Sequence, residues 1–514
     1  MSHDIIVVGA GSAGCALAER LSRDPACTVL LIEAGPQGRH PFVQMPAGVA
    51  KAIAAPQFNW HFETVPQAHM DGRKLYVPRG RVMGGSSGIN AMVWVTGHAS
   101  DYDHWAANGC PGWGWADVAP VLADVEQAMD PQMPGSGNAA FAAFVAAGGQ
   151  MGHPTAPFVD GQAPGFGMYR LNIRDGRRRS AAAAYLSLAR GRANLTIRSG
   201  VQVLGLSGDG ARIDGVRIAA GGGTETLTAG HVVLCAGAIG TPHLLLLSGI
   251  GPAADLRALG IPLRADLAGV GANLHDHLEV KVKHRMTKPL SLWDHAKFPN
   301  NLAVGAQWLL SKTGIGTQQG LEAGAFLRLG AGDGPPDTQL HYINALAFDG
   351  ATADDRGHGF AIDVTQLQPE SRGRLKLASA DPTQKPRIDP NYLAVEGDRI
   401  ALREGLKMLR DLCRQHAMTD FTGAELRPGP DVTSDADLDA VVRATADSIY
   451  HPVGTAKMGT DPMAVVDPAT MGVHGIQGLS VADASVMPRI TSGNTNAPSI
   501  VIGALGAAKI AAAL

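Results

Sequence analysis

Several features are scarce in this chain of 514 residues, and each scarcity narrows the class of protein. The formal net charge is only −3, so no basic footprint for nucleic acid is visible. No stretch of 18 or more apolar residues predicts a transmembrane helix. The opening residues, MSHDIIVVGAG, lack the basic and apolar regions of a secretory signal, so we expect a cytoplasmic protein.

Cysteine is also scarce and scattered. The five cysteines form no CxxC pair and no cluster with zinc-ligand spacing; they are Cys15, Cys27, Cys110, Cys235 and Cys413. This argues against a disulfide scaffold and a structural metal, and it fits a reducing compartment.

The chain is rich in hydrophobic residues (45%) and in glycine (65 residues), which fits a large globular core with many tight turns. The length predicts two to four domain-sized units.

The first 33 residues read as a complete βαβ unit. The run DIIVV predicts a buried parallel strand, and it leads directly into GAGSAG, which has GxGxxG spacing. A helix over CALAERLSRDP and a second strand over CTVLLIE follow. Gly9 permits the tight turn, Gly11 lets the backbone approach a pyrophosphate, and Gly14 lets helix and strand pack closely. The helix N-terminus then offers free N–H groups to the phosphates.

Glu33 ends the second strand, 19 residues after Gly14, where its carboxylate can accept hydrogen bonds from a ribose diol. The unit therefore predicts a dinucleotide whose ribose lacks a 2′-phosphate. The motif alone does not separate NAD from FAD, and a glycine-rich turn in an ordinary α/β protein is the alternative.

A second glycine-rich segment points to one of these cofactors. GRVMGGSSGIN, residues 80–90, resembles a signature of the glucose–methanol–choline (GMC) oxidoreductases, which are flavoenzymes that use FAD. Further segments resemble the family in its own order: NWHFETVPQ, GAIGTPHLLLLSGIG, GVGANLHDHL, YHPVGTAKMGTDPMAVVDP and GLSVADASVMPRITSGNTNAPS. Within the family, the tail looks most like the bacterial alcohol and choline dehydrogenase branch.

The resemblance implies a fold and a division of the chain. It implies an α/β protein (α+β overall) with a Rossmann-type FAD-binding domain and a substrate-binding domain built on an antiparallel sheet flanked by helices. The FAD-binding domain would comprise residues 1–155, 190–285 and 440–514, and the substrate-binding domain 156–189 and 286–439. The apolar C-terminal run APSIVIGALGAAKIAAAL is then expected as a buried core helix, with contact to a membrane surface as the alternative.

The resemblance also implies the residues that hold FAD. They are Gly9, Gly11, Ser12, Gly14, Glu33, Ala34, Trp60, Arg81, Gly84, Gly85, Ser86, Asn90, Ala91, Met92, Val93, Val203, Asp483, Ala484, Asn494 and Thr495. Some relatives attach FAD covalently through a His near the first signature. Ile89 stands at the matching position and cannot form that bond, so we expect non-covalent FAD.

The same comparison implies the catalytic pair. His451 in YHPVGT matches the family's catalytic His, and Asn494 in GNTNAPS matches its partner. A neutral imidazole suits removal of the hydroxyl proton, whereas an Asn can orient the substrate oxygen but cannot act as a base. Asn494 could alternatively cap the helix that follows it. His275, Asp276 and His277 resemble a metal cluster, but their alternating spacing favours a structural role, and we expect no metal.

The predicted reaction is oxidation of a primary alcohol to the aldehyde by hydride transfer to flavin N5. A sugar, a polyol or choline is an alternative substrate, and a non-redox lyase that keeps FAD is an alternative activity. Choline would need aromatic faces and a carboxylate, yet aromatic residues are only 5% of the chain. Glu322 is the candidate carboxylate, and the candidate pocket aromatics are Trp94, Trp293, Trp308, Phe326, Tyr342 and Phe348. The electron acceptor stays open between a quinone, a carrier protein and O₂, and no nucleic-acid partner is expected.

Overall fold

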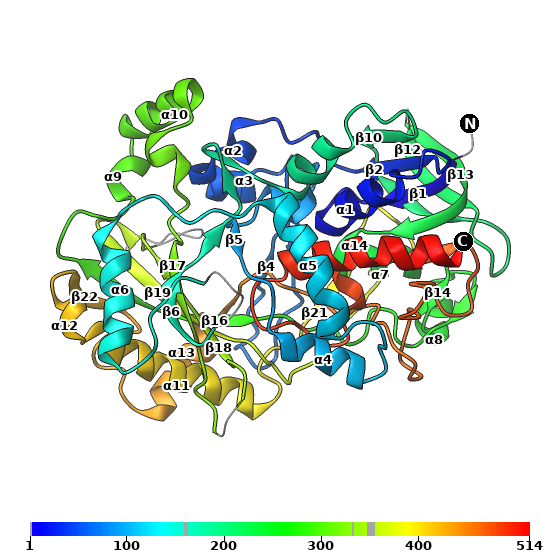
Figure 1. Ribbon diagram of the computed structural model, residues 1–514. Coiled ribbons are helices and arrows are strands. Elements are labelled where there is room, and N and C mark those ends of the chain that lie inside the picture. The colour runs from blue at the N-terminus through cyan, green and yellow to red at the C-terminus, as the bar shows by residue number, and fades with distance from the viewer. Residues whose placement is uncertain (1–2, 159–162, 221, 332–333, 347–354) are drawn as a thin grey trace.

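The structure is a computed structural model that describes residues 3–158, 163–220, 222–331, 334–346 and 355–514. Two sheets lie on opposite sides of the molecule, each with helices packed against it (Figure 1). One sheet is mainly parallel and the other is antiparallel. This architecture confirms the predicted fold class.

The first sheet begins with the expected βαβ unit. β1 (His3–Val8) pairs in parallel with β2 (Val29–Glu33), and α1 (Ser12–Leu21) connects them. Gly9 has φ +103°, and a Cβ there would lie 2.5 Å from a backbone carbonyl oxygen. A Cβ on Gly14 would lie 1.9 Å from the carbonyl oxygen of Gly9. Only glycine fits both positions, so the tight turn and the close packing of α1 follow directly from the motif.

The other strands of this sheet come from distant parts of the chain. The strand order is β10-β2-β1-β13-β12-β11, with β24 paired in parallel to β13. Their bounds are β10 (Leu195–Ser199), β11 (Val203–Ser207), β12 (Gly215–Ala220), β13 (Gly223–Leu234) and β24 (Leu479–Val481). The segments ANLTIRSGVQVLGL and HVVLCAGAIG thus return to the nucleotide-binding sheet, as their apolar pattern indicates.

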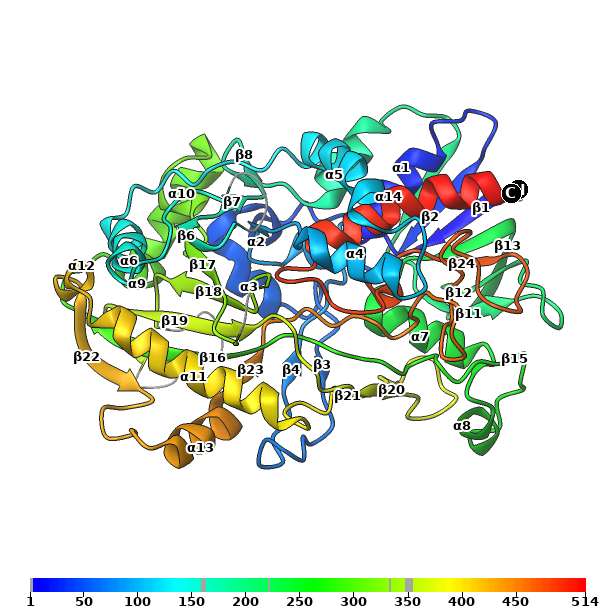
Figure 2. The same ribbon diagram turned by 60° about the horizontal axis from the view of Figure 1, so that its bottom comes forward.

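The C-terminal helix α14 (Asn496–Ala513) packs along α1 and beside α5 (Trp115–Met129) (Figures 1 and 2). A Cβ on Gly503 would lie 2.2 Å from the carbonyl oxygen of Ala13, so the two helix backbones approach closely. Within the described ranges, α14 alone is long and apolar enough to cross a membrane, and 56% of it is buried inside the protein. It therefore packs as a core helix, as expected.

The second sheet is antiparallel in the order β22-β16-β19-β18-β17-β6, and β23 pairs with the start of β16. α6 and α11 pack against one of its faces, and α13 packs on α11 (Figure 2). The bounds are β6 (Gly165–Met168), β16 (Leu278–Met286), β17 (Ala323–Leu327), β18 (Thr338–Ile343), β19 (Gly359–Gln366), β22 (Thr422–Arg427), β23 (Asp447–Ser448), α6 (Ala139–Gln150), α11 (Glu396–Cys413) and α13 (Asp435–Thr445).

The two faces of this sheet differ in chemistry. Successive side chains of a strand point to opposite faces. In β16, β18 and β19 the apolar set packs against the helices; it comprises Val280, Val282, Leu340, Tyr342, Ile362 and Val364. The alternate set faces a cavity and is polar; it comprises Glu279, Lys281, His341 and Asp363. A sheet that is buried on both faces thus presents ionisable groups to the interior.

The remaining helices and strands connect or cover the two sheets. Ser434 caps α13 by accepting a hydrogen bond from the N–H of Asp437, and β20 pairs with β21 in an antiparallel ribbon. The bounds are α2 (Pro41–Gln44), η1 (Pro46–Gly48), α3 (Val49–Ala54), β3 (Phe62–Glu63), β4 (Tyr76–Val77), η2 (Gly85–Gly88), β5 (Val93–Trp94), α4 (Ala99–Ala107), β7 (Arg170–Leu171), β8 (Ile173–Arg174), β9 (Arg177–Arg178), η3 (Ala182–Leu186), α7 (Gly237–Leu247), β14 (Ile250–Gly251), α8 (Ala253–Ala258), β15 (Ala265–Asp266), α9 (Trp293–Ala296), α10 (Asn300–Ser311), η4 (Gly314–Thr317), β20 (Arg374–Lys376), β21 (Arg387–Asp389), α12 (His416–Thr419) and η6 (Ala484–Val486).

The division into two domains remains a prediction. β16 belongs to the second sheet, so the change from one sheet to the other falls at residue 278 and not after 285. We therefore expect a domain boundary near residue 277.

Candidate active site

A cavity of about 940 Å³ lies between the two sheets. The first sheet and the loops that follow its strands line one part of it, and the polar face of the second sheet lines another. The cavity thus joins the glycine-rich phosphate loop to the ionisable groups of the antiparallel sheet.

Most of the predicted site residues line this cavity. They are Gly9, Gly11, Ser12, Glu33, Ala34, Trp60, Arg81, Gly85, Ser86, Asn90, Ala91, Met92, Val93, Val203, His451, Asp483, Ala484, Asn494 and Thr495. Gly14 and Gly84 are not among the residues that line it, and their contact with the cofactor stays a prediction. Gly14 serves the packing of α1, and Gly84 has φ +99° and turns the chain into η2.

The glycine-rich second segment packs backbone against backbone. A Cβ on Gly85 would lie 2.6 Å from the Cα of Gly11, and a Cβ on Gly80 would lie 2.2 Å from Gly85. Ser86 Oγ accepts the N–H of Gly80 at 3.1 Å and closes the turn. The segment is therefore poor in side chains because it lies directly against the phosphate loop, in addition to lining the cavity.

The nucleotide end of the cavity has the polar groups that FAD requires. The Glu33 carboxylate accepts the backbone N–H groups of Ala10 at 3.0 Å and Gly35 at 2.8 Å, which hold it at the end of β2. Burial raises the pKa of Glu33 to about 7. Arg81 Nε and Asn496 Nδ2 are buried donors without a hydrogen-bond partner among the described residues. Buried donors are normally satisfied, so these two fit a ligand with several acceptor oxygens.

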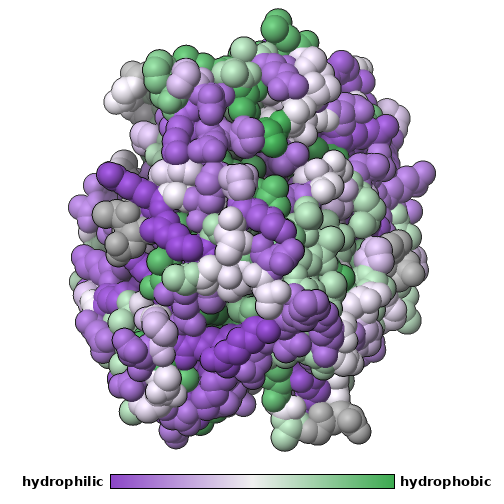
Figure 3. Space-filling model, turned by 90° about the vertical axis from the view of Figure 1, so that its left-hand side faces the viewer, coloured by the Kyte–Doolittle hydropathy of each residue, from purple (hydrophilic) through white to green (hydrophobic). Residues whose placement is uncertain are grey.

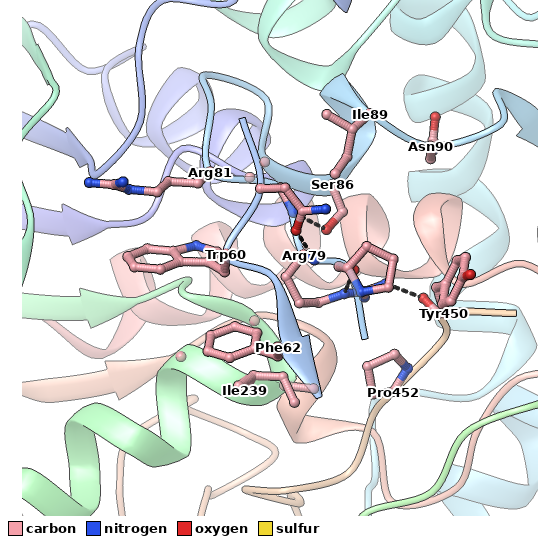
Figure 4. Close-up of a pocket in the computed structure, with 18 of the residues that line it drawn as sticks. Trp60, Phe62, Arg79, Arg81, Ser86, Ile89, Asn90, Ile239, Tyr450 and Pro452 are labelled. Carbon is pink, nitrogen blue, oxygen red and sulfur yellow. Dashed lines mark hydrogen bonds between the residues drawn. The ribbon is translucent and has the colours of Figure 1, made fainter. Parts of the chain in front are cut away.

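An aromatic and basic wall lies beside this end (Figure 4). Trp60 and Phe62 stack with ring centroids 6.1 Å apart, and the Arg81 guanidinium lies 5.0 Å from the Trp60 ring. Nearby, the Arg79 guanidinium donates to the carbonyl oxygen of Tyr450. The sequence pointed to Trp60 and Arg81, whereas Phe62, Arg79 and Tyr450 were missed. Phe62 and Tyr450 lie within the segments NWHFETVPQ and YHPVGT that resemble the family, so these segments could have marked them.

At the other end of the cavity two histidines face each other. His277 Nδ1 lies 3.0 Å from His451 Nδ1, and His277 Nε2 lies 3.1 Å from the carbonyl oxygen of Leu367. A carbonyl only accepts, so His277 Nε2 carries the hydrogen and its Nδ1 must accept. His451 therefore donates from Nδ1, and its Nε2 keeps a lone pair.

The side-chain amide of Asn494 faces the lone pair on His451 Nε2. Its Nδ2 lies 3.2 Å from His451 Nε2, and its Oδ1 accepts from Gln339 Nε2 at 3.2 Å. The Gln339 contact fixes which end of the Asn494 amide faces the histidine. The helix α14 begins after Thr495 without a side-chain cap, so the alternative interpretation of Asn494 as a helix cap is wrong.

Both histidines are held neutral. Burial lowers the pKa of His277 to about 3. Burial, with the nearby His277 and Arg79, lowers the pKa of His451 well below its ordinary value.

Asp276 accepts hydrogen bonds from the hydroxyls of Tyr392 and Ser448 and from the backbone N–H of His451 at 2.7 Å. Asp276 thus holds the loop that carries His451, which agrees with a structural role. The interpretation of the sequence assigned His277 the same role and missed its contact with His451.

The second sheet adds a cluster of ionisable side chains to the cavity. His341 Nδ1 lies 2.9 Å from Asp363 Oδ1, and Lys281 forms an ion pair with Glu279. Burial, together with the neighbouring Asp363, raises the pKa of Glu279 well above its ordinary value. Burial opposes ionisation of Asp363 too, but His341 and the hydrogen bond with Glu279 keep its pKa low. The two neighbouring carboxyl groups thus have opposite pKa shifts, which favours a protonated Glu279 beside an ionised Asp363.

The predicted choline-site residues lie elsewhere. Glu322 lines a separate cavity of about 570 Å³ and accepts the hydroxyl of Ser136. Trp94, Trp293, Trp308, Phe326 and Tyr342 do not line the cavity that holds His451, and Phe348 lies outside the described residues. The second sheet instead brings two carboxyl groups to the cavity, Asp363 and Glu279, and β16 carries Glu279 two residues after His277.

A phosphate-loop fold with a neutral histidine facing the same cavity defines a dinucleotide-dependent oxidoreductase. Family models for the GMC oxidoreductases match residues 3–279 with the N-terminal model and 369–503 with the C-terminal model. The chain therefore belongs to the GMC oxidoreductase family; it is an enzyme that acts on CH–OH donors, and its cofactor is FAD.

Relatives in sequence and structure match nearly the whole chain. It is 42% identical to an oxygen-dependent choline dehydrogenase of Photobacterium profundum, over 98% of this chain and 91% of the relative. A solved pyridoxine 4-oxidase from Mesorbium loti has a TM-score of 0.87 and 32% identity, covering 99% of both chains. A formate oxidase of Aspergillus oryzae RIB40 has a TM-score of 0.91 and 27% identity, covering 100% of this chain and 98% of the other.

Proposed function

We propose that this enzyme oxidises a primary alcohol to the aldehyde, with His451 Nε2 as the base that removes the hydroxyl proton. The observation that carries the proposal is the hydrogen-bond chain from the Leu367 carbonyl through His277 to His451, which leaves a lone pair on His451 Nε2. Without that chain either tautomer of a neutral imidazole would be available, and only one of them has an unprotonated Nε2.

Asn494 orients the substrate in this proposal. Its Nδ2 lies 3.2 Å from His451 Nε2, so an alcohol oxygen that replaces this direct contact and touches both nitrogens donates its proton to the histidine and accepts from the amide. As the proton leaves, the same amide hydrogen bond stabilises the developing negative charge on oxygen. Gln339 holds the amide in this orientation.

FAD, when bound, supplies the acceptor for the hydride that leaves the carbinol carbon. Residues at the phosphate loop, Glu33 and the aromatic wall hold the cofactor in this proposal. Ile89 lines the cavity and offers no nucleophile, which supports non-covalent binding.

The charge balance around the cavity favours an uncharged alcohol. The raised pKa of Glu279 favours its neutral form, and Lys281 opposes the negative charge of the carboxyl groups beside it. Choline is the second candidate, because relatives with 42% identity are choline dehydrogenases and Glu279 faces the cavity that holds His451. A quaternary ammonium would then have to displace Lys281 from Glu279, with Tyr450 as an aromatic face.

Anaerobic titration separates these candidates. The yellow enzyme is mixed with primary alcohols, choline and polyols in turn, and bleaching of the flavin absorbance identifies the substrate class. Bleaching by a primary alcohol with release of the aldehyde supports the proposal, whereas bleaching by choline alone selects the second candidate. An enzyme that releases an aldehyde from a cyanohydrin without bleaching would be a lyase, and the proposal would be wrong.

A further inference from the structure

The outward face of α10 is apolar. Leu302, Ala303, Ala306, Leu309 and Leu310 follow the i, i+1, i+4, i+7, i+8 spacing of one helix face, and all five are exposed. Leu302 is 62% exposed, Leu309 55% and Leu310 89%, and Phe298 just before the helix is 79% exposed. We call these six residues the apolar stripe. A surface helix normally turns its apolar face inward, so the stripe is reversed from the usual pattern.

The other face of the helix is fixed to the protein. Trp308 is buried, and its indole Nε1 donates to the carbonyl oxygen of Gly176 at 2.7 Å. Val304 and Gly305 are partly buried on the same side. The buried Trp308 side chain holds the helix in this orientation, and the stripe on the opposite face is therefore directed outward. The helix projects at the upper left of Figure 1, and Figure 3 shows hydrophobic side chains gathered at that end of the molecule.

At each end of the stripe, a lysine ammonium group lies over a tryptophan ring. Lys297 Nζ lies 4.4 Å from the Trp293 ring centroid, and Lys312 Nζ lies 4.2 Å from that of Trp308. Residues 288–312 contain three lysines and one aspartate, whereas the whole chain has a net charge of −3. Two of these lysines form ion pairs, Lys288 with Asp420 and Lys297 with Asp294, each at 3.0 Å. The segment still has two more lysines than aspartates, so a partner that contacts it gains modestly from carrying negative charge.

We propose that the apolar stripe docks this enzyme on an anionic lipid surface. Helices that lie in a membrane interface combine an apolar face with flanking lysines and aromatic residues, which is the composition of this segment. A second copy of the chain is the weaker occupant, because a stable protein interface takes roughly 20–30 residues a side and the stripe offers six. The buried α14 is not needed for this contact.

Vesicle flotation with the FAD-loaded enzyme tests the proposal. Vesicles of phosphatidylcholine with phosphatidylglycerol are compared with vesicles of phosphatidylcholine alone. We expect binding to the anionic vesicles, several-fold weaker binding to the neutral ones, and weakening by salt. The triple variant Leu302→Gln, Leu309→Gln, Leu310→Gln should bind at least about tenfold more weakly. Its flavin absorbance and melting temperature should match the wild type, since the three side chains make few contacts.

The matched control is Leu188→Gln with Leu263→Gln, which changes two exposed leucines outside the segment and should leave vesicle binding unchanged. Equal binding by the triple variant and the wild type would overturn the proposal, as would a wild type that binds neither kind of vesicle. A wild type that is dimeric by light scattering, with a monomeric triple variant and no vesicle binding, would instead identify the stripe as a contact between two copies.

Discussion

His277 Nδ1 lies 3.0 Å from His451 Nδ1, and the hydrogen between them belongs to His451 because the Leu367 carbonyl takes the other hydrogen of His277. This contact places the hydrogen of the neutral His451 imidazole on Nδ1. The Nε2 atom, which faces Asn494, is therefore unprotonated. The proposed base is thus prepared by a residue that need not touch the substrate, and His277 is a positioning residue.

Replacing His277 separates positioning from structure. His277→Leu removes the acceptor, so the His451 tautomer is no longer fixed, and we expect kcat to fall by about 10²-fold with little change in KM. His277→Asn loses the same Leu367 contact but keeps an oxygen acceptor toward His451, and it should stay within about tenfold of the wild type. Steady-state kinetics of the two variants provide the measurement. Equal losses in both would show that His277 has only a structural role.

The pH dependence of turnover follows from the pKa of His451. The base must be neutral, and burial lowers its pKa well below the ordinary value of 6.5. Lowering the pKa extends the neutral form to more acidic pH, so kcat should stay flat through pH 6.5 and fall only below it. A pH–rate profile with a soluble dye as electron acceptor measures this. An acid limb centred at or above 6.5 would contradict a buried, neutral His451.

Two glycines of one motif should respond differently to the same change. A Cβ on Gly11 meets no atom closer than 3.9 Å, so Gly11→Val should fold but fill the space that the FAD pyrophosphate needs. A Cβ on Gly14 would lie 1.9 Å from a backbone carbonyl oxygen, so Gly14→Val should unfold the βαβ unit. We expect a stable, colourless Gly11→Val protein and little soluble Gly14→Val protein. A fully yellow Gly11→Val variant would refute the phosphate-loop assignment.

The mode of FAD attachment has a direct chemical test. Ile89 lines the cavity where some relatives carry a linking histidine, and an isoleucine forms no bond to the flavin. Acid precipitation should therefore release all of the yellow colour into the supernatant, and the precipitated chain should have its unmodified mass. Colour that stays with the precipitate would show a covalent link through another residue.

The parts of the site that could be predicted from the sequence are the local ones. Gly9, Gly11 and Glu33 are set by a short βαβ unit, whose turn and strand ends lie within about thirty residues. His451 and Asn494 came from the family resemblance, and the structure brings them within 3.2 Å of each other.

What could not be predicted depends on strand pairing over long distances. Glu279 and Asp363 meet only because β16 pairs with β19, which lies about eighty residues further along the chain. Alternation along these strands then decides which side chains face the cavity. Glu322 was the sequence candidate for a carboxylate near the substrate. It lies just before β17, in a different part of the sheet, and the Glu322 side chain lines a separate cavity.

The most direct test of the central claim is the rate of anaerobic flavin reduction by a primary alcohol, measured by stopped flow in the wild type and in His451→Gln. The account predicts that the variant keeps its full FAD content and is reduced about 10²- to 10⁴-fold more slowly, because the general base is missing while the cofactor site is intact. Reduction of the variant at the wild-type rate would show that another group takes the proton, and the assignment of His451 as the base would be wrong.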